Sequence, residues 1–130
     1  MLKIWKKNIQ TLVDFIKKIY KLGEIMTIIN TTDETFQKEV IESEKITIVD
    51  MWAPWCSPCK AMDPVLSEIA EEMKEIKICK HNIDSEPNYP SRYNVRSIPT
   101  LLLFSNKELK DQKVGFTNKE NIKSWIKNNL

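Results

Sequence analysis

The sequence contains little cysteine, glycine or histidine and no long apolar run. It has three cysteines, two glycines and one histidine in 130 residues. Three cysteines are too few for a disulfide-stabilised scaffold, and the odd number leaves at least one thiol unpaired. No uninterrupted apolar run reaches the roughly 18 residues that a membrane-spanning helix needs. These absences exclude a disulfide scaffold and a transmembrane helix.

The composition fits one globular domain with a real core. Hydrophobic residues make up 42% of the chain and charged residues 29%, and a single core typically serves about 100 to 200 residues. The net charge of +2 makes general nucleic-acid binding a poor interpretation. The charge is distributed unevenly along the chain, because residues 1–25 contain six lysines and only two acidic residues. That segment therefore carries +4 and the remainder carries −2.

Residues 1–25 have the pattern of a basic amphipathic helix. Apolar side chains recur at steps of three and four, with lysines on the opposite face. The apolar positions are Trp5, Ile9, Leu12, Ile16 and Ile19. Gly23, near the end of this segment, marks the junction with the rest of the chain, so we place a boundary at residues 23–26 and expect one domain over residues 26–130.

This basic extension has three interpretations. It could lie on an anionic membrane surface through its apolar face. It is a poor export signal, because Asp14 interrupts the apolar stretch and no small-residue cleavage site precedes Met26. The third interpretation is that translation starts at Met26, with residues 22–25 encoded by a sequence that resembles a ribosome-binding site.

Hydrophobic periodicity predicts an α/β fold. Predicted strands cover residues 27–29, 46–52, 76–80, 100–104 and 109–114. Predicted helices cover residues 31–42, the stretch that follows Cys56 through Met73, at most one short segment before Pro99, and the C-terminal stretch after Thr117. Capping boxes are expected at Thr31-x-x-Glu34 and Thr117-x-x-Glu120. The order of these elements implies a mixed central sheet with helices on both faces.

The most informative segment is Trp55-Cys56-Ser57-Pro58-Cys59-Lys60, between a buried strand and a helix. At such a junction, the amides and the positive dipole end of the helix stabilise a thiolate at Cys56, which becomes the attacking group. Cys59 lies one turn inside the helix, where it can resolve a mixed disulfide. Pro58 fits the first turn, where its missing N–H costs nothing.

Two other interpretations of this cysteine pair are weaker. A zinc site would need two more ligands, and the chain offers only Cys79 and His81, on a different element. We therefore expect no metal. A purely structural disulfide would gain little, because its four-residue loop has little closure entropy.

Asp50 lies inside a predicted buried strand, six residues before Cys56. Burial is costly for an acid and should raise its pKa toward neutrality. Its functional interpretation is an acid/base for Cys59, and the alternative is a structural carboxylate paired with Lys80 on the adjacent strand. The nearby cysteine pair favours the functional interpretation.

Three segments, taken together in order and spacing, resemble the thioredoxin family. They are Val49-Asp50-Met51-Trp52-Ala53-Pro54-Trp55-Cys56-Ser57-Pro58-Cys59-Lys60, Asn82-Ile83-Asp84 and Arg96-Ser97-Ile98-Pro99-Thr100. The resemblance runs from about residue 26 to the C-terminus. It implies a thioredoxin-like fold, with a cis peptide before Pro99 facing the thiols and a free backbone edge for an extended substrate.

The same resemblance implies a set of site residues. Cys56, Cys59, Asp50, Lys80 and Pro99 would be catalytic, with Asp50 and Lys80 serving proton transfer. The substrate-binding groove would comprise Trp55, Ser57, Pro58, Ile98, Val114 and Gly115. Pro64 would kink the active-site helix.

Four residues stand where this family often has glycine. Ser57 follows the first cysteine and adds a hydroxyl beside the sulfurs. Asn94, Ser97 and Lys107 occupy turns, where we expect strain at positive φ. None of these substitutions removes a reacting atom.

The remaining candidates have plain structural interpretations. Cys79 alternates with Ile78 and Lys80 on a strand and is expected to be a small buried residue rather than a regulatory thiol. His81 has no partners in a recognisable motif, so we expect a strand or surface role. Trp52 and Trp125 are expected in the core.

The sequence predicts a monomeric cytoplasmic protein-disulfide reductase. It would bind no cofactor, and the resemblance implies that NADPH supplies electrons through a thioredoxin reductase. Proline before the second cysteine resembles the reducing members of the family. The alternatives are a membrane-associated or exported thiol-exchange protein, and a binding module that uses the groove without turnover.

Overall fold

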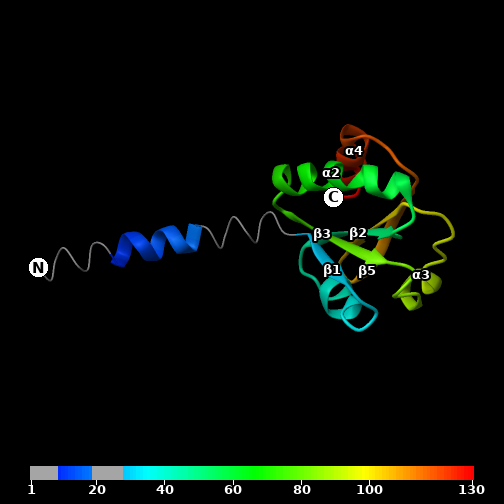
Figure 1. The fold of residues 1–130 in the computed structure, drawn as a ribbon, viewed down its shortest axis with the longest axis horizontal. Coiled ribbons are helices and arrows are strands. Elements are labelled where there is room, and N and C mark those ends of the chain that lie inside the picture. Colours follow the sequence, from blue (N-terminus) through cyan, green and yellow to red (C-terminus); the bar gives the residue numbers. More distant parts are fainter. Residues whose placement is uncertain (1–8, 19–27) are drawn as a thin grey trace, which may run out of the picture.

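The chain builds one five-stranded sheet between two layers of helices (Figure 1). The computed structural model describes residues 9–18 and 28–130. The strands are β1 (Ile29–Thr31), β2 (Ile46–Trp52), β3 (Ile76–Asn82), β4 (Thr100–Ser105) and β5 (Glu108–Val114). The helices are η1 (Gln37–Ile41), α2 (Ser57–Glu72), α3 (Asn88–Arg92) and α4 (Lys119–Asn128). The predicted mixed sheet with helices on both faces is confirmed.

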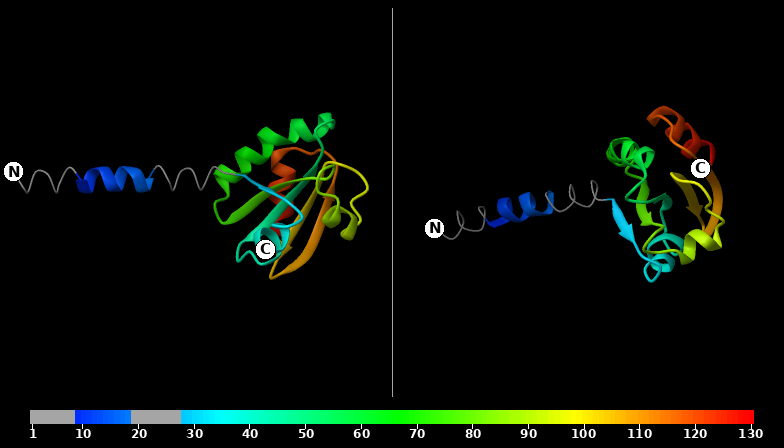
Figure 2. Two further views of the ribbon diagram at one scale, coloured as in Figure 1. Left: turned by 60° about the horizontal axis from the view of Figure 1, so that its bottom comes forward. Right: turned by 45° about the vertical axis from the view of Figure 1, so that its right-hand side comes forward.

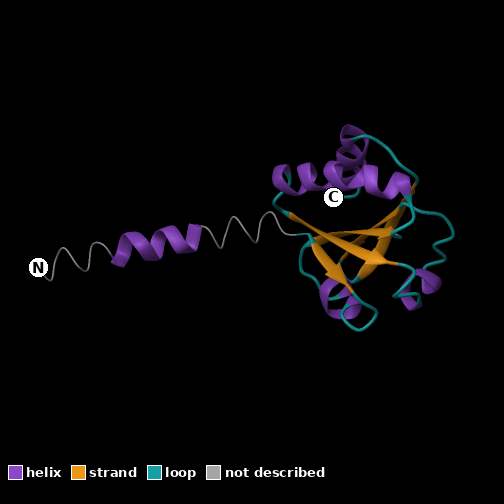
Figure 3. Ribbon diagram, in the orientation of Figure 1, coloured by secondary structure: helices purple, strands orange, loops and turns teal. Residues whose placement is uncertain are grey.

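Strand order is β1-β3-β2-β4-β5, which puts β2 in the middle. β2 runs parallel to β3 and antiparallel to β4, and β5 returns antiparallel to β4. The two further views show α2 and α4 along one side of the sheet (Figure 2). Figure 3 distinguishes helices, strands and loops by colour. The central strand β2 therefore leads directly into the N-terminus of α2 at a position covered by neighbours on both sides.

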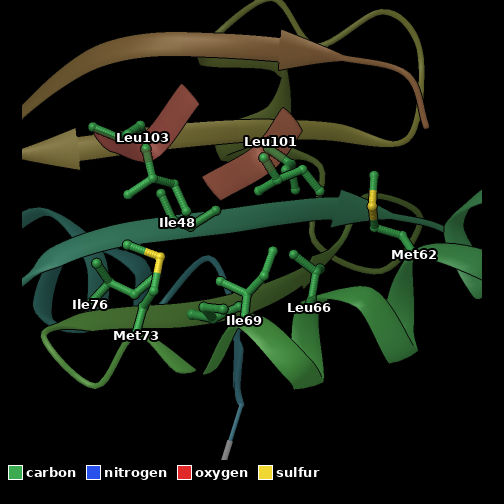
Figure 4. Close-up of a cluster of buried hydrophobic side chains, with 11 residues drawn as sticks. Ile48, Met62, Leu66, Ile69, Met73, Ile76, Leu101 and Leu103 are labelled. Carbon is green, nitrogen blue, oxygen red and sulfur yellow. The ribbon is translucent and has the colours of Figure 1, made fainter. Parts of the chain in front are cut away.

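Side-chain alternation gives each face of the sheet its own core. On the α2 and α4 face, Ile48 packs with Leu101, Leu103 and Leu66 (Figure 4). On the other face, Phe36 stacks on Tyr89 with ring centroids 4.1 Å apart and packs with Leu102. These two apolar layers hold β2 rigidly, because side chains from both layers bury it along most of its length.

Both predicted capping boxes are wrong by one residue. Thr31 belongs to β1, and its hydroxyl contacts the Nδ1 of His81 at 2.9 Å. The turn before η1 is instead closed by Thr32 and Thr35, each accepting the other's backbone N–H through its hydroxyl. At α4 the cap is Asn118, whose side chain accepts from the N–H of Asn121. Asn118 has the extended backbone conformation typical of an N-cap, whereas the N-cap of η1 is Phe36, which makes no side-chain capping hydrogen bond.

The expected strain at positive φ is found at two of three positions. Asn94 has φ of 56° and Lys107 has φ of 67°, and Asn106 beside it has φ of 52°. Two consecutive residues at positive φ suit the two-residue turn between β4 and β5. Ser97 is not among the described residues with positive φ, so that prediction is wrong.

Part of the basic extension is described, and residues 9–18 form a helix. Its apolar side chains, which include Leu12 and Phe15, are exposed. The amphipathic pattern predicted for residues 1–8 and 19–25 lies outside the described residues, as does Thr27 of the first predicted strand. Among the described helices, none is long and apolar enough to cross a membrane.

Candidate active site

A disulfide joins Cys56 and Cys59 at the N-terminus of α2, with their Cα atoms 5.3 Å apart. Cys56 is the N-cap of the helix and has extended backbone angles. The backbone N–H of Cys59 points at the Cys56 Sγ, at 3.2 Å. When the disulfide is reduced, this donor and the helix dipole favour a thiolate on Cys56. Ser57 and Pro58 occupy the first turn between the two sulfurs, as predicted.

The disulfide is shielded by apolar neighbours. Cys56 and Cys59 are both buried, and they pack with Ala53, Ile83 and Ile98. Little of either cysteine is therefore exposed to solvent. Low polarity around the sulfurs strengthens the electrostatic effect of the helix N-terminus on a thiolate.

Asp50 is fully buried in β2, on the α2 face of the sheet. Neither carboxylate oxygen has a hydrogen-bond partner among the described residues. Burial raises the pKa of Asp50 from 3.8 to about 7, while the Lys80 ammonium opposes this rise and the Asp63 carboxylate adds to it. The carboxyl group is thus positioned to exchange a proton near neutral pH.

Lys80 lies opposite Asp50 in the β2–β3 register, yet its ion pair is with another acid. Its Nζ is 2.5 Å from the Oδ1 of Asp63 on α2, and it lies 4.5 Å from the centre of the Trp52 ring. The alternative interpretation, a structural ion pair between Asp50 and Lys80, is therefore wrong. Asp63 was not predicted from the sequence, although it is an acid four residues after Cys59 and therefore lies on the same side of the helix.

Pro99 follows a cis peptide bond, as the resemblance implied. Its carbonyl accepts the N–H of Gly115 at 2.8 Å, which ties the end of β5 to the segment beside the disulfide. Ile98 packs against the two cysteines. The structure thus brings Ile98, Pro99, Val114 and Gly115 together along one strip.

Exposed apolar side chains gather at this end of the domain. Trp55 is 67% exposed, Val114 63% and Phe116 52%. The Trp55 indole N–H donates to Asp84 at 2.7 Å, which fixes the ring. Phe116 was not predicted as an exposed residue of this surface. Its position in the connection between β5 and α4, outside the core-forming elements, was the available signal. Large exposed apolar groups of this kind mark binding surfaces.

The other candidate residues have structural surroundings. Cys79 is fully buried, and burial raises its pKa to about 12. His81 lies in β3, which confirms the strand role, but it is fully buried, with Nε2 3.0 Å from the Glu86 carbonyl oxygen, so the surface role is wrong. Alternation places both residues on the face opposite α2, away from the disulfide. Within residues 9–18 and 28–130, no three His, Cys, Asp or Glu side chains are grouped to hold a metal.

The two tryptophans expected in the core are only partly buried. Trp52 packs beside the cysteine cluster and beneath Lys80. The Trp125 indole reaches the surface and donates to Asp111 at 2.7 Å. Both rings therefore combine an apolar contact with a polar or charged one, as amphipathic aromatic side chains commonly do.

Comparison with known proteins gives a consistent match. The family model described as thioredoxin matches residues 27–128. A thioredoxin of Rickettsia felis is 48% identical over 102 residues, covering 78% of this chain and 97% of the relative. Thioredoxins of Buchnera aphidicola subsp. Schizaphis graminum and Acidithiobacillus ferridurans are 44% and 41% identical over 104 residues, each covering 79% of this chain and 96% of the relative. The matched stretch contains all of the site residues described above.

Proposed function

Because this chain belongs to the thioredoxin family and is a protein-disulfide reductase, we propose that Cys56 attacks the substrate disulfide and Cys59 resolves the intermediate. The observation that carries this assignment is the position of Cys56 at the N-cap of α2, where the Cys59 N–H points at its sulfur. The Cys56 thiolate breaks the substrate S–S bond, forms a mixed disulfide and releases one substrate thiolate. Cys59 then attacks the Cys56 sulfur and releases the second, so two electrons pass to the substrate.

Asp50, assisted by Lys80, moves the proton of the resolving step. Cys59 must lose its proton before it attacks, and it is buried away from water. Asp50 is the acid buried on the same face of β2 that α2 covers, and its raised pKa lets it accept that proton near neutral pH. Lys80 limits the rise in this pKa, which keeps part of the Asp50 population ionised.

The substrate is a disulfide in an accessible protein segment with apolar neighbours. The groove comprises Trp55, Ser57, Pro58, Ile98, Pro99, Val114 and Gly115. Support comes from the exposure of Trp55, which precedes Cys56 in the chain, and of Val114, which pairs with Thr100 next to Pro99. Such a surface gains free energy when a partner covers it, and the partner brings its disulfide to Cys56.

The reductant is NADPH, delivered through a thioredoxin reductase, and the protein acts as a monomer in the cytoplasm. The relatives named thioredoxin support this assignment, as does Pro58 before the second cysteine. Residues 26–130 form the thioredoxin domain that carries the activity, and residues 1–25 are an extension outside it. A surface contact with a membrane would involve only that extension.

A coupled assay tests this electron path. Mixing the protein with NADPH, a bacterial thioredoxin reductase and insulin should oxidise one NADPH for each insulin disulfide reduced, followed as loss of absorbance. The matched control omits only this protein and should show background oxidation alone. If dithiothreitol supports insulin reduction through the protein but the reductase with NADPH does not, the proposed partner is wrong.

A further inference from the structure

We propose that Asp63 is a positioning residue that holds the Lys80 ammonium away from Asp50, so that the buried carboxyl of Asp50 stays available for proton transfer at the disulfide. This inference rests on the proton-transfer role proposed above for Asp50. It assigns a function to a third charged residue, on the helix that begins with the two cysteines.

The ion pair that Lys80 forms is not the one that the register of the sheet would predict. Asp50 and Lys80 are directly paired residues on β2 and β3, and both side chains lie on the α2 face. A lysine directly opposite a buried acid would ordinarily pair with it. Instead, its Nζ is 2.5 Å from the Oδ1 of Asp63, and neither oxygen of Asp50 has a hydrogen-bond partner among the described residues.

Two contacts hold Lys80 in this arrangement. Asp63 binds the ammonium from α2, one helical turn beyond Cys59. The Trp52 ring lies beneath the same ammonium, 4.5 Å from its centre, and Trp52 is two residues after Asp50 on β2. The Lys80 side chain is only 17% exposed, so its conformation is set by these neighbours and little by solvent.

The charged groups that face Asp50 come from two elements. Lys80 lies on β3 and Asp63 on α2. The β4 residue opposite Asp50 is Leu101, and α4 contributes the apolar Ile122 to the layer above this face. Among the described residues, the balance between Lys80 and Asp63 therefore sets the electrostatic surroundings of Asp50.

Loss of the Asp63 charge acts on Asp50 in one direction. The Lys80 ammonium loses its anchor and can move toward Asp50, and the repulsion between the two carboxylates disappears. Both changes stabilise the ionised form of Asp50 and lower its pKa. A weaker base at Asp50 takes the proton of Cys59 less readily, so resolution of the mixed disulfide slows.

The test is a titration of Asp50 by carbon-13 NMR in protein labelled at the aspartate carboxyl groups. In Asp63→Asn, the midpoint of Asp50 should fall by on the order of one pH unit. Asp63→Glu keeps the charge and should restore most of the wild-type midpoint. The matched control is Glu71→Gln, which removes an exposed acid from the same helix and should leave the midpoint unchanged. An unmoved or raised midpoint in Asp63→Asn would overturn the proposal.

A double-mutant cycle tests whether Asp63 acts through Lys80. In a Lys80→Met background, the shift caused by Asp63→Asn should shrink to less than half of its size in the wild-type background. A shift of undiminished size would mean that Asp63 acts on Asp50 directly, and would contradict the positioning role.

The pH dependence of mixed-disulfide resolution separates this inference from the function on which it rests. Asp63→Asn should move the profile to lower pH and lower the plateau rate by roughly two- to fivefold. If Asp50→Asn keeps the wild-type profile, the proton-transfer role of Asp50 fails, whatever the NMR titration shows. If Asp50→Asn flattens the profile while Asp63→Asn leaves it in place, the role of Asp50 stands and that of Asp63 fails.

Discussion

The Cys56→Ser variant is expected to lose insulin-disulfide reduction completely, because a serine hydroxyl cannot supply the thiolate that attacks the substrate disulfide. Cys59→Ser should behave differently. Its Cys56 still attacks, but no resolving thiol follows, so a covalent mixed disulfide with the substrate accumulates. Mass spectrometry of the intact protein detects this adduct directly, and an insulin turbidity assay measures turnover.

The control for both variants is Cys79→Ser, which replaces the third cysteine on the opposite face of the sheet. It should keep wild-type turnover per folded molecule, because Cys79 takes no part in the exchange. Residual turnover by Cys56→Ser would contradict the assignment of the nucleophile. A substrate that is bound with full affinity but never reduced by the wild-type protein would instead support a binding module.

Replacing Asp50 with asparagine is expected to stabilise the oxidised protein at pH 8 by about 4 kcal/mol. The pKa of Asp50 is raised from 3.8 to about 7 in the folded protein. Between these values the folded state holds a proton that the unfolded state has lost, so the free energy of unfolding falls as pH rises through this window. Asparagine stays neutral and avoids the cost of burying a carboxylate.

The measurement is urea unfolding of wild type and Asp50→Asn between pH 4 and pH 8. The two proteins should have nearly equal stability at pH 4, and the difference should grow until about pH 7. Glu71→Gln provides the control, because loss of an exposed acid should produce no comparable pH-dependent difference. A difference of constant size across the whole range would show that the substitution acts through packing and not through titration.

Much of this site could be predicted from local sequence. The order of apolar strand, cysteine pair and helix locates the reacting sulfurs, because a strand that leads into a helix necessarily presents the helix N-terminus at the junction. Asp50 stands out for a related reason, since an acid inside an apolar strand requires an explanation. Both predictions depend only on residues adjacent in the chain, which the sequence gives directly.

The features that escaped prediction depend on contacts between distant residues. Lys80 forms its ion pair with Asp63, 17 residues away, and not with Asp50, which it faces in the register. This pairing depends on the position of α2 above β3, which the sequence does not show. His81 can be fully buried because its two ring nitrogens have partners, the Glu86 carbonyl and, 50 residues away in the chain, the Thr31 hydroxyl. The misplaced caps differ by one residue, since adjacent polar residues compete for the same role.

The reduction potential of the Cys56–Cys59 pair tests the central claim most directly. The protein is equilibrated with glutathione buffers of known ratio, the free thiols are alkylated, and the modified fraction is read by mass spectrometry. A reductase of this family should give a strongly reducing value, near the −270 mV or so that is typical of thioredoxins. A value near the roughly −120 mV of the strongly oxidising DsbA would contradict a reducing role and identify the protein as a donor of disulfides.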